Sequence, residues 1–183
     1  MLERLLIEHA APTLASIKTA SLFCCFFSSA EELYCQILKW NFILNRKGVS
    51  ILILCLRKDS ALLYVYRSAL LQEDLCKNGV KEFLAEYGYC GNDVDKFLLK
   101  LQEKLAVAES FPHEIGIFLG YPLRDVVGFI QNGGKNYKSV GLWKVYDNEK
   151  EALCFFEKIR KCRDLYMRLW KRGMSITQLT VAV

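Results

Sequence analysis

Two apolar runs separated by a short polar turn constrain the fold of this chain more than any other feature. Residues 49–56 read VSILILCL, residues 61–67 read ALLYVYR, and RKDS (57–60) connects them. Strand-length runs rich in β-branched and aromatic residues around a short polar turn are typical of a β-hairpin. Both runs are almost unbroken in apolar character. We therefore expect both strands to be largely buried in a sheet that helices cover.

Further strands are expected at 13–27, 111–119, 142–146 and 175–183. The run LFCCFF within the first of these suits a strand that is buried on both faces. Strand and helix patterns alternate after residue 111, which favours parallel crossover connections. These patterns predict a single α/β (or α+β) domain spanning 1–183, built on a mixed five- or six-stranded sheet.

Helices are expected at 2–9, 29–48, in one or two pieces over 68–88, after Gly91, after Pro122 and at 149–172. The first should stop before Pro12, because a residue that precedes proline avoids the α region. Ser29 and Glu32 have the spacing of a capping box, and Gly48 suits a left-handed helix end.

The positive charge of the chain is local. The formal net charge is +5 over 183 residues, but Lys158–Arg172 alone carries seven basic residues and one acidic residue, so the rest sums to about −1. This basic helix end predicts an acidic protein partner or a solvated face, and nucleic acid is an unlikely partner without an accompanying motif. No apolar run reaches membrane-spanning length, and the N-terminus lacks a secretory signal, so we expect a cytoplasmic protein without membrane contact.

The eight cysteines form no CxxC pair. A disulfide framework is typical of small secreted chains, and this chain fits neither description. We therefore expect free thiols that behave as small buried hydrophobes, and no metal site. A redox or metal role is the alternative.

The stretch from Phe111 to Tyr146 is the best candidate for a functional site. His113 and Glu114 are candidate catalytic residues, although neighbours on a strand face opposite ways and would need partners from elsewhere. The corner Gly120-Tyr121-Pro122 leads into a helix whose free backbone N–H groups attract anions. Asp125 in the first helical turn would compete with such an anion. No phosphate-binding motif accompanies the corner, so no specific nucleotide follows, and the identity of any cofactor is left unknown.

The loop after this helix is cationic and rich in glycine. Lys135 and Lys138 are candidate point charges for an acidic ligand, and Asn136 is a candidate hydrogen-bond partner. A solvated connection is the equally weighted alternative. His9, which precedes a predicted corner, is a further candidate ligand contact.

Four segments resemble the domain of unknown function 3793 family, which is found mainly in anaerobic Firmicutes. They are HAAPTLASIKTASLF (9–23), FPHEIGIFLGYPLRDVVGFI (111–130), GLWKVY (141–146) and KCRDLY (161–166). The resemblance runs along nearly the whole chain and implies a bacterial protein, but no established activity. It also implies that His9, His113, Glu114, Gly120 and Asp125 belong to one site.

One position departs from the family pattern. A cysteine often follows the first histidine in that family, whereas this chain has Ala10. A thiol function at that position is therefore in doubt.

Three functions remain open from the sequence. The first is an accessory protein that binds a small anionic ligand or cofactor at 113–138. The second is an enzyme that uses His113 as an acid or base, and the third is an interaction module that acts through the basic last helix.

Overall fold

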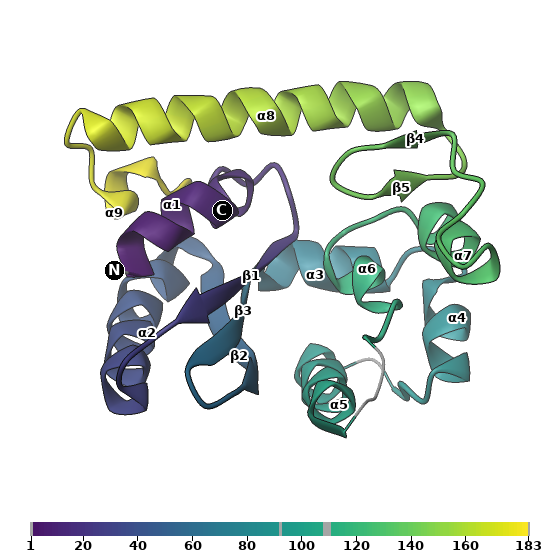
Figure 1. Cartoon of the computed structure of the whole chain (residues 1–183), viewed down its shortest axis with the longest axis horizontal. Helices are drawn as coiled ribbons and strands as arrows, with labels where there is room; N and C mark the ends of the chain where they lie inside the picture. Colours follow the sequence, from purple (N-terminus) through teal and green to yellow (C-terminus); the bar gives the residue numbers. More distant parts are fainter. Residues whose placement is uncertain (1, 92, 108–110, 183) are drawn as a thin grey trace.

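The computed structural model describes residues 2–91, 93–107 and 111–182, and it places helices around a small antiparallel sheet (Figure 1). In chain order the elements are α1 (Leu2–Leu14), β1 (Ala20–Phe26), α2 (Ala30–Leu44), the 3-10 helix η1 (Asn45–Lys47), β2 (Val49–Leu56), β3 (Ser60–Arg67), α3 (Ser68–Leu75), α4 (Val80–Glu86), α5 (Val94–Val107), α6 (Ile115–Phe118), α7 (Leu123–Gln131), β4 (Ser139–Val140), β5 (Lys144–Val145), α8 (Glu149–Lys171) and α9 (Ile176–Leu179).

The main sheet has the strand order β1-β3-β2, and both of its pairings are antiparallel. In the central strand, Leu63 faces Phe23 on one side and Ile53 on the other. A separate two-stranded hairpin, β4–β5, pairs Ser139 with Val145. The predicted β-hairpin and the mixture of helices and strands are confirmed. The prediction of one mixed sheet with five or six strands is wrong, because the described strands form sheets of three and two, all antiparallel.

Two of the predicted strands are helical. The apolar run that reaches Leu119 contains α6, and an unbroken apolar run cannot distinguish a buried helical turn from a buried strand. The segment from Ser175 onward begins α9, because Ser175 and Gln178 form a complete capping box. Local hydrogen bonds there outweigh the β-branched composition. Without these strands, the predicted parallel crossovers have no place in the described fold.

The N-terminal boundaries also differ from the prediction. Helix α1 continues to Leu14 and contains Pro12 in its last turn, and the extended segment begins only at Ala20. The helix buries an apolar face against the sheet and α8, which offsets the hydrogen bond that Pro12 cannot donate. β1 is an edge strand in which Cys24 and Phe26 are exposed, so it is not buried on both faces.

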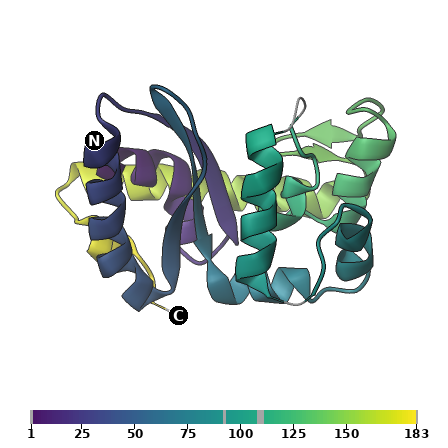
Figure 2. The ribbon, with the colours of Figure 1, turned by 90° about the horizontal axis from the view of Figure 1, so that it is seen from below.

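Helices cover both faces of the sheet, as predicted (Figure 2). α1, α2 and the C-terminal half of α8 pack with Phe23, Leu63 and Val65 in one core cluster. The other face directs Tyr64 and Tyr66 toward α3, α5 and α6, and the two rings are stacked with centroids 5.0 Å apart. Two apolar cores therefore lie on opposite sides of the same three strands.

A buried arginine joins three remote segments at the end of β3. Arg67 is 1% exposed, and its guanidinium donates hydrogen bonds to the carbonyl oxygens of Thr13, Leu14, Lys47 and Val181. Two of these acceptors end α1, where carbonyl groups lack helical partners and carry the negative end of the helix dipole. The charge of Arg67 is therefore balanced by backbone dipoles.

Side chains close the outer edge of β2. The amide of Asn41 on α2 accepts from the backbone N–H of Ile51 at 2.7 Å and donates to its carbonyl oxygen at 2.9 Å. Gln102 on α5 donates to the carbonyl oxygen of Ile53 at 2.7 Å. These amides satisfy backbone groups that an edge strand otherwise leaves open.

The capping residues predicted at the two ends of α2 and η1 are largely confirmed. Ser29 accepts from the backbone N–H of Glu32 at 3.2 Å, and Gly48 adopts a left-handed φ of 74°, as predicted. The reciprocal bond from Glu32 does not form, since its carboxylate instead accepts from Gln36.

All eight cysteines are free thiols, as predicted. Cys24 and Cys25 face opposite ways, with Cys24 exposed and Cys25 buried. Burial raises the pKa of Cys162 to about 11, which agrees with an inert position on the buried side of α8. The expectation of buried thiols is wrong for Cys24, Cys35, Cys76, Cys90 and Cys154, which are exposed.

Candidate functional site

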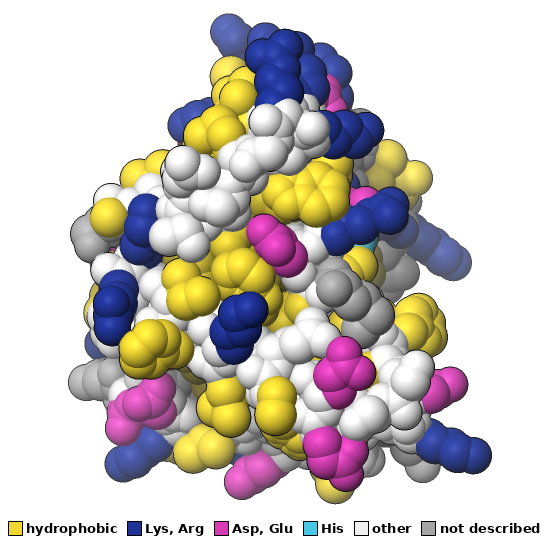
Figure 3. Space-filling model, turned by 90° about the vertical axis from the view of Figure 1, so that its left-hand side faces the viewer, with side chains coloured by type: hydrophobic (Ala, Val, Ile, Leu, Met, Phe, Trp, Pro, Cys, Tyr) yellow, Lys and Arg dark blue, Asp and Glu magenta, His cyan; other side chains and the backbone are white. Residues whose placement is uncertain are grey.

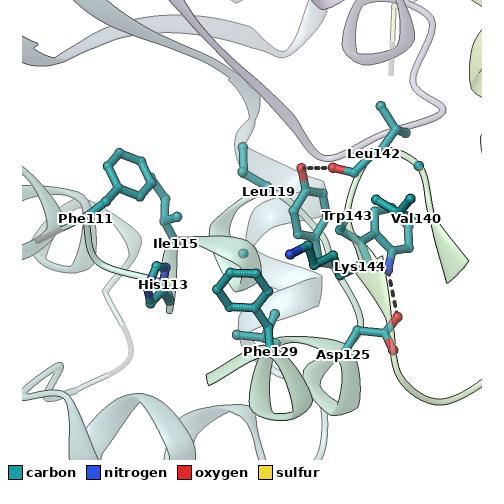
Figure 4. Close-up of a pocket in the computed structure, with 14 residues that line it drawn as sticks. Phe111, His113, Ile115, Leu119, Asp125, Phe129, Val140, Leu142, Trp143 and Lys144 are labelled. Carbon is teal, nitrogen blue, oxygen red and sulfur yellow. Dashed lines mark hydrogen bonds between the residues drawn. The ribbon is translucent and has the colours of Figure 1, made fainter. Parts of the chain in front are cut away.

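A mainly apolar pocket of about 360 Å³ lies between α6, α7 and the β4–β5 hairpin (Figure 4). The 111–146 stretch folds back on itself around this pocket. The lining comprises Phe111, His113, Ile115, Gly116, Leu119, Tyr121, Asp125, Val126, Phe129, Val140, Gly141, Leu142, Trp143 and Lys144. A concave apolar site with few polar groups is the usual form of a small-molecule pocket.

Asp125 fixes the hairpin that forms one wall of the pocket. Its carboxylate is 3% exposed and accepts from the indole N–H of Trp143 at 2.7 Å and from the backbone N–H groups of Tyr146 and Asp147 at 2.7 and 3.0 Å. Three donors compensate the burial of this charge. Asp125 therefore positions Trp143, a role that the sequence analysis did not assign to it.

Aromatic rings form the inner wall. Trp143 packs against Tyr121 with ring centroids 4.6 Å apart, and against Phe156 of α8 with an edge-to-face geometry at 4.6 Å. The Tyr121 hydroxyl donates to the carbonyl oxygen of Leu142 at 3.3 Å. Burial raises the pKa of Tyr121 to about 12. This hydroxyl is therefore a hydrogen-bond donor rather than a base near neutral pH.

Lys144 supplies a cation to the pocket. Its Nζ donates to the carbonyl oxygen of Gly134 at 2.7 Å and lies over the rings of Phe129 and Tyr137, at 5.7 and 4.9 Å from their centroids. Figure 4 shows the amine above Phe129, on the side that faces the pocket. A lysine ammonium has three donors, and this one uses only one of them on the described residues. Lys144 therefore retains donors for a ligand.

His113 lies at the opposite side of the pocket, on the segment that leads into α6. Its ring meets Phe129 edge-on with centroids 4.9 Å apart, and it makes no hydrogen bond within the described ranges. The neighbouring Glu114 turns away from the pocket. Glu114 is 2% exposed, and its carboxylate pairs with the Lys104 ammonium and accepts from the Tyr89 hydroxyl at 3.4 Å. His113 and Glu114 therefore do not pair with each other, as predicted. The predicted reason, opposite faces of a strand, does not apply, because the two residues precede the helical turn α6.

Gly120 belongs to a second, more polar hollow of about 560 Å³ behind Tyr121 and Trp143. Its φ is 75°, and a Cβ atom would lie 2.6 Å from Thr19 Oγ1 and 3.1 Å from Asp74 Oδ2. Glycine is required both by the left-handed backbone and by this close approach. Tyr121, Asp125 and Trp143 line both hollows and so separate them.

Lys18, which the sequence analysis missed, lies behind this dividing wall. It is 8% exposed, its Nζ donates to the carbonyl oxygen of Ala20, and it lies 5.2 Å from the centroid of the Tyr121 ring. Burial lowers its pKa to about 7, and the charge of Asp74 only partly opposes this shift. The available signal was a lone charged residue in an otherwise uncharged stretch, SIKTASLF.

The remaining predicted ligand contacts do not line the apolar pocket. His9 stacks on Phe23 with centroids 5.0 Å apart and borders a different hollow against α8. Lys138 donates to the carbonyl oxygen of Asp147 at 2.6 Å, and Asn136 to Asn132 Oδ1 at 3.3 Å. Lys135 is exposed. Their roles in ligand binding stay predictions.

The five residues that the family resemblance groups into one site therefore lie at different places in the structure. His113 and Asp125 line the apolar pocket, Gly120 and Asp125 line the polar hollow, and His9 and Glu114 lie elsewhere. Tyr121, Trp143 and Lys144 also line the apolar pocket.

The basic end of α8 is partly neutralised on its own helix. Arg160 pairs with Glu157 at 2.8 Å and Asp164 at 3.4 Å, and Lys161 also approaches Glu157. Arg168 and Lys171 are exposed in its last turn. An acidic protein partner for this end stays a prediction.

Among the residues that the structure describes, no group of three or more His, Cys, Asp or Glu side chains is placed to hold a metal ion. None of the described helices combines the length and the apolar character needed to cross a membrane.

Comparison with known proteins identifies a family without an assigned activity. No curated protein and no solved structure matches the chain. The family model described as Protein of unknown function (DUF3793) matches residues 6–180, which is nearly the whole chain. The chain therefore belongs to the DUF3793 family.

Proposed function

We propose that this protein binds a small ligand with an apolar, preferably planar, body and one anionic group in the pocket between α6, α7 and the β4–β5 hairpin. The observation that carries the proposal is the placement of Lys144 in a mainly apolar, aromatic lining. Aromatic walls favour a flat apolar body through stacking, and the ammonium favours a carboxylate, sulfonate or phosphate.

The other charged group in the lining does not oppose this assignment strongly. Asp125 already accepts three N–H donors, which compensate its negative charge. His113 lines the same pocket and makes no hydrogen bond to the described residues, so its ring N–H is free to serve as a second donor to a ligand.

The enzyme alternative lacks a favouring observation. General acid or base work requires His113 to have an orienting partner or a reacting group within hydrogen-bond reach. Glu114 is held by Lys104, Asp125 is held by the hairpin, and no cysteine is among the pocket residues. Binding is therefore the function that the described geometry supports best.

A fluorescent probe with the proposed chemistry tests this function. Anilinonaphthalene sulfonate has an aromatic body and one anionic group, and its emission rises in an apolar site. We expect saturable binding that Lys144→Met weakens roughly tenfold, equivalent to ~1.4 kcal/mol. Val140→Trp, at an exposed lining position, should block the pocket without disturbing the core.

Lys135→Met is the matched control, because it removes a nearby lysine charge outside the lining. It should leave the affinity unchanged. Equal affinities for the Lys144 and Lys135 variants, together with unchanged binding in Val140→Trp, would refute the proposal. Native mass spectrometry of anaerobically purified protein then looks for the natural ligand as an added mass.

A further inference from the structure

Helix α2 has two apolar faces, although only one of them packs against the protein. Leu33, Ile37 and Leu44 are buried against the sheet. On the opposite side, Tyr34, Leu38 and Phe42 follow one another at four-residue intervals and are 47%, 69% and 69% exposed. Side chains four residues apart lie on one helix face, so these three form a continuous outward stripe. We call it the outer stripe.

Charges of opposite sign mark the two ends of the outer stripe. Glu31 and Glu32 lie in the first turn of α2, and Arg46 lies just beyond its last turn. The Arg46 guanidinium lies over the Phe42 ring, 4.7 Å from the centroid, and so belongs to the stripe. Figure 3 views this side of the molecule, where hydrophobic side chains lie among acidic and basic ones.

The outer stripe is self-complementary about Leu38. Tyr34 and Phe42 are both aromatic and lie equally far from Leu38 in opposite directions along the helix. In an antiparallel pair related by a two-fold axis at Leu38, each Tyr34 faces the Phe42 of the other copy. Glu31 then lies within one residue, ~1.5 Å of axial rise, of the Arg46 of the other copy. The dipoles of the two helices are then antiparallel, which is favourable because opposite partial charges lie side by side.

We propose that two copies of this chain associate through the outer stripes of their α2 helices, antiparallel and related by a two-fold axis. A two-fold interface requires one patch to complement itself, and this stripe satisfies the requirement in both shape and charge. An anionic lipid surface fits less well, because Glu31 and Glu32 occupy one end. The described edge of β2 is not available for self-pairing, since Asn41 and Gln102 occupy it.

Sedimentation velocity over a range of protein concentrations tests the proposal. Wild-type protein should show a monomer–dimer equilibrium, and Leu38→Glu should be monomeric at every concentration. Leu153→Glu is the matched control, because Leu153 is a similarly exposed leucine on α8. Thermal melting should show that all variants remain folded, since the substituted side chains are exposed.

Charge reversal distinguishes this interface from any other. Glu31→Lys alone and Arg46→Glu alone each place like charges in contact twice per dimer, and each should weaken self-association about tenfold or more. When the two variants are mixed, both contacts become attractive in the heterodimer, so association should return to the wild-type level. A monomeric wild type, an unaffected Leu38→Glu variant or a mixture that stays monomeric would each overturn the proposal.

Discussion

Arg67 and Val181 lie 114 positions apart in the sequence, yet Arg67 Nη2 donates a hydrogen bond to the Val181 carbonyl oxygen at 2.8 Å. The same guanidinium holds the last carbonyl groups of α1, so one side chain joins β3, α1 and the C-terminal segment. Burial lowers the pKa of Arg67 from its usual value, but the group remains charged at any ordinary pH.

Arg67→Lys should therefore destabilise the protein by ~2–4 kcal/mol. A lysine ammonium keeps the charge but cannot reach carbonyl groups on three segments, and buried acceptors without donors cost free energy. Urea unfolding followed by circular dichroism measures the change in the free energy of unfolding. Arg57→Lys, in the exposed hairpin turn, is the control and should change it little. A loss below ~0.5 kcal/mol for Arg67→Lys would show that water replaces the guanidinium.

Asp125→Asn should loosen the wall of the apolar pocket. One amide oxygen still accepts from the backbone, but the amide N–H₂ meets the Trp143 indole N–H, which is also a donor. The expected loss of unfolding free energy is ~1–3 kcal/mol. A red shift in tryptophan emission would report the increased exposure of Trp143. Asp147→Asn, which removes only the exposed pairing with Arg124, should leave the emission unchanged.

Lys18→Met should remove a specific pH dependence of stability. The folded-state pKa of Lys18 is lowered to about 7 from 10.5, so above pH 7 the unfolded chain binds one more proton than the folded chain. The stability of the wild type should then rise by ~1.4 kcal/mol per pH unit from this group as the pH increases above 7. Below pH 7 Lys18 is protonated in both states, so the cost of burying its charge destabilises the folded protein in full.

The measurement is the difference in unfolding free energy between Lys18→Met and wild type from pH 7 to 8.5. The variant should be the more stable protein at pH 7, and its advantage should shrink as the pH rises. Lys77→Met removes an exposed lysine that pairs with the same Asp74, and it serves as the control. A constant difference across this range would contradict a lowered pKa for Lys18.

Thiol alkylation should divide the cysteines into two classes. Burial raises the pKa of Cys25 and of Cys162, so both lack access and thiolate character. Mass spectrometry after timed alkylation at pH 8 should show modification of the exposed cysteines first, namely Cys24, Cys35, Cys76, Cys90 and Cys154. Cys25 and Cys162 should react only on the timescale of unfolding. Early modification of Cys162 would mean that α8 detaches locally from α1.

Local signals in the sequence predict the elements whose hydrogen bonds are local. The Ser29 cap, the left-handed Gly48 and the 49–67 hairpin depend on residues within a few positions of one another, and all three are confirmed. The predicted number of strands was too high for two reasons: α6 is a short, fully buried apolar segment, and the capping box that begins α9 outweighs its β-branched residues. A buried helical turn and a buried strand read alike at that length.

The position of the candidate site was predictable from the sequence, but only some of the residues that line it were. The stretch 111–146 does fold around a pocket, and His113 and Tyr121 line it. Lys144 and Trp143 were part of a predicted strand, where nothing local distinguishes a pocket side chain from a packed one. The glycine-rich loop drew attention to Lys135 and Lys138 instead. Arg67 could not be assigned, because its partners are carbonyl groups far along the chain, and Lys18 could not, because the Tyr121 ring beside it comes from a remote segment.

The Asn41 amide, which bonds both backbone groups of Ile51, does for β2 what a fourth strand would do. Because this amide belongs to α2, the sheet cannot recruit another strand at that edge unless the helix first moves away. The position of α2 thus prevents the addition of a further strand at this edge. The aggregation-prone edge of β2 becomes accessible only after α2 detaches.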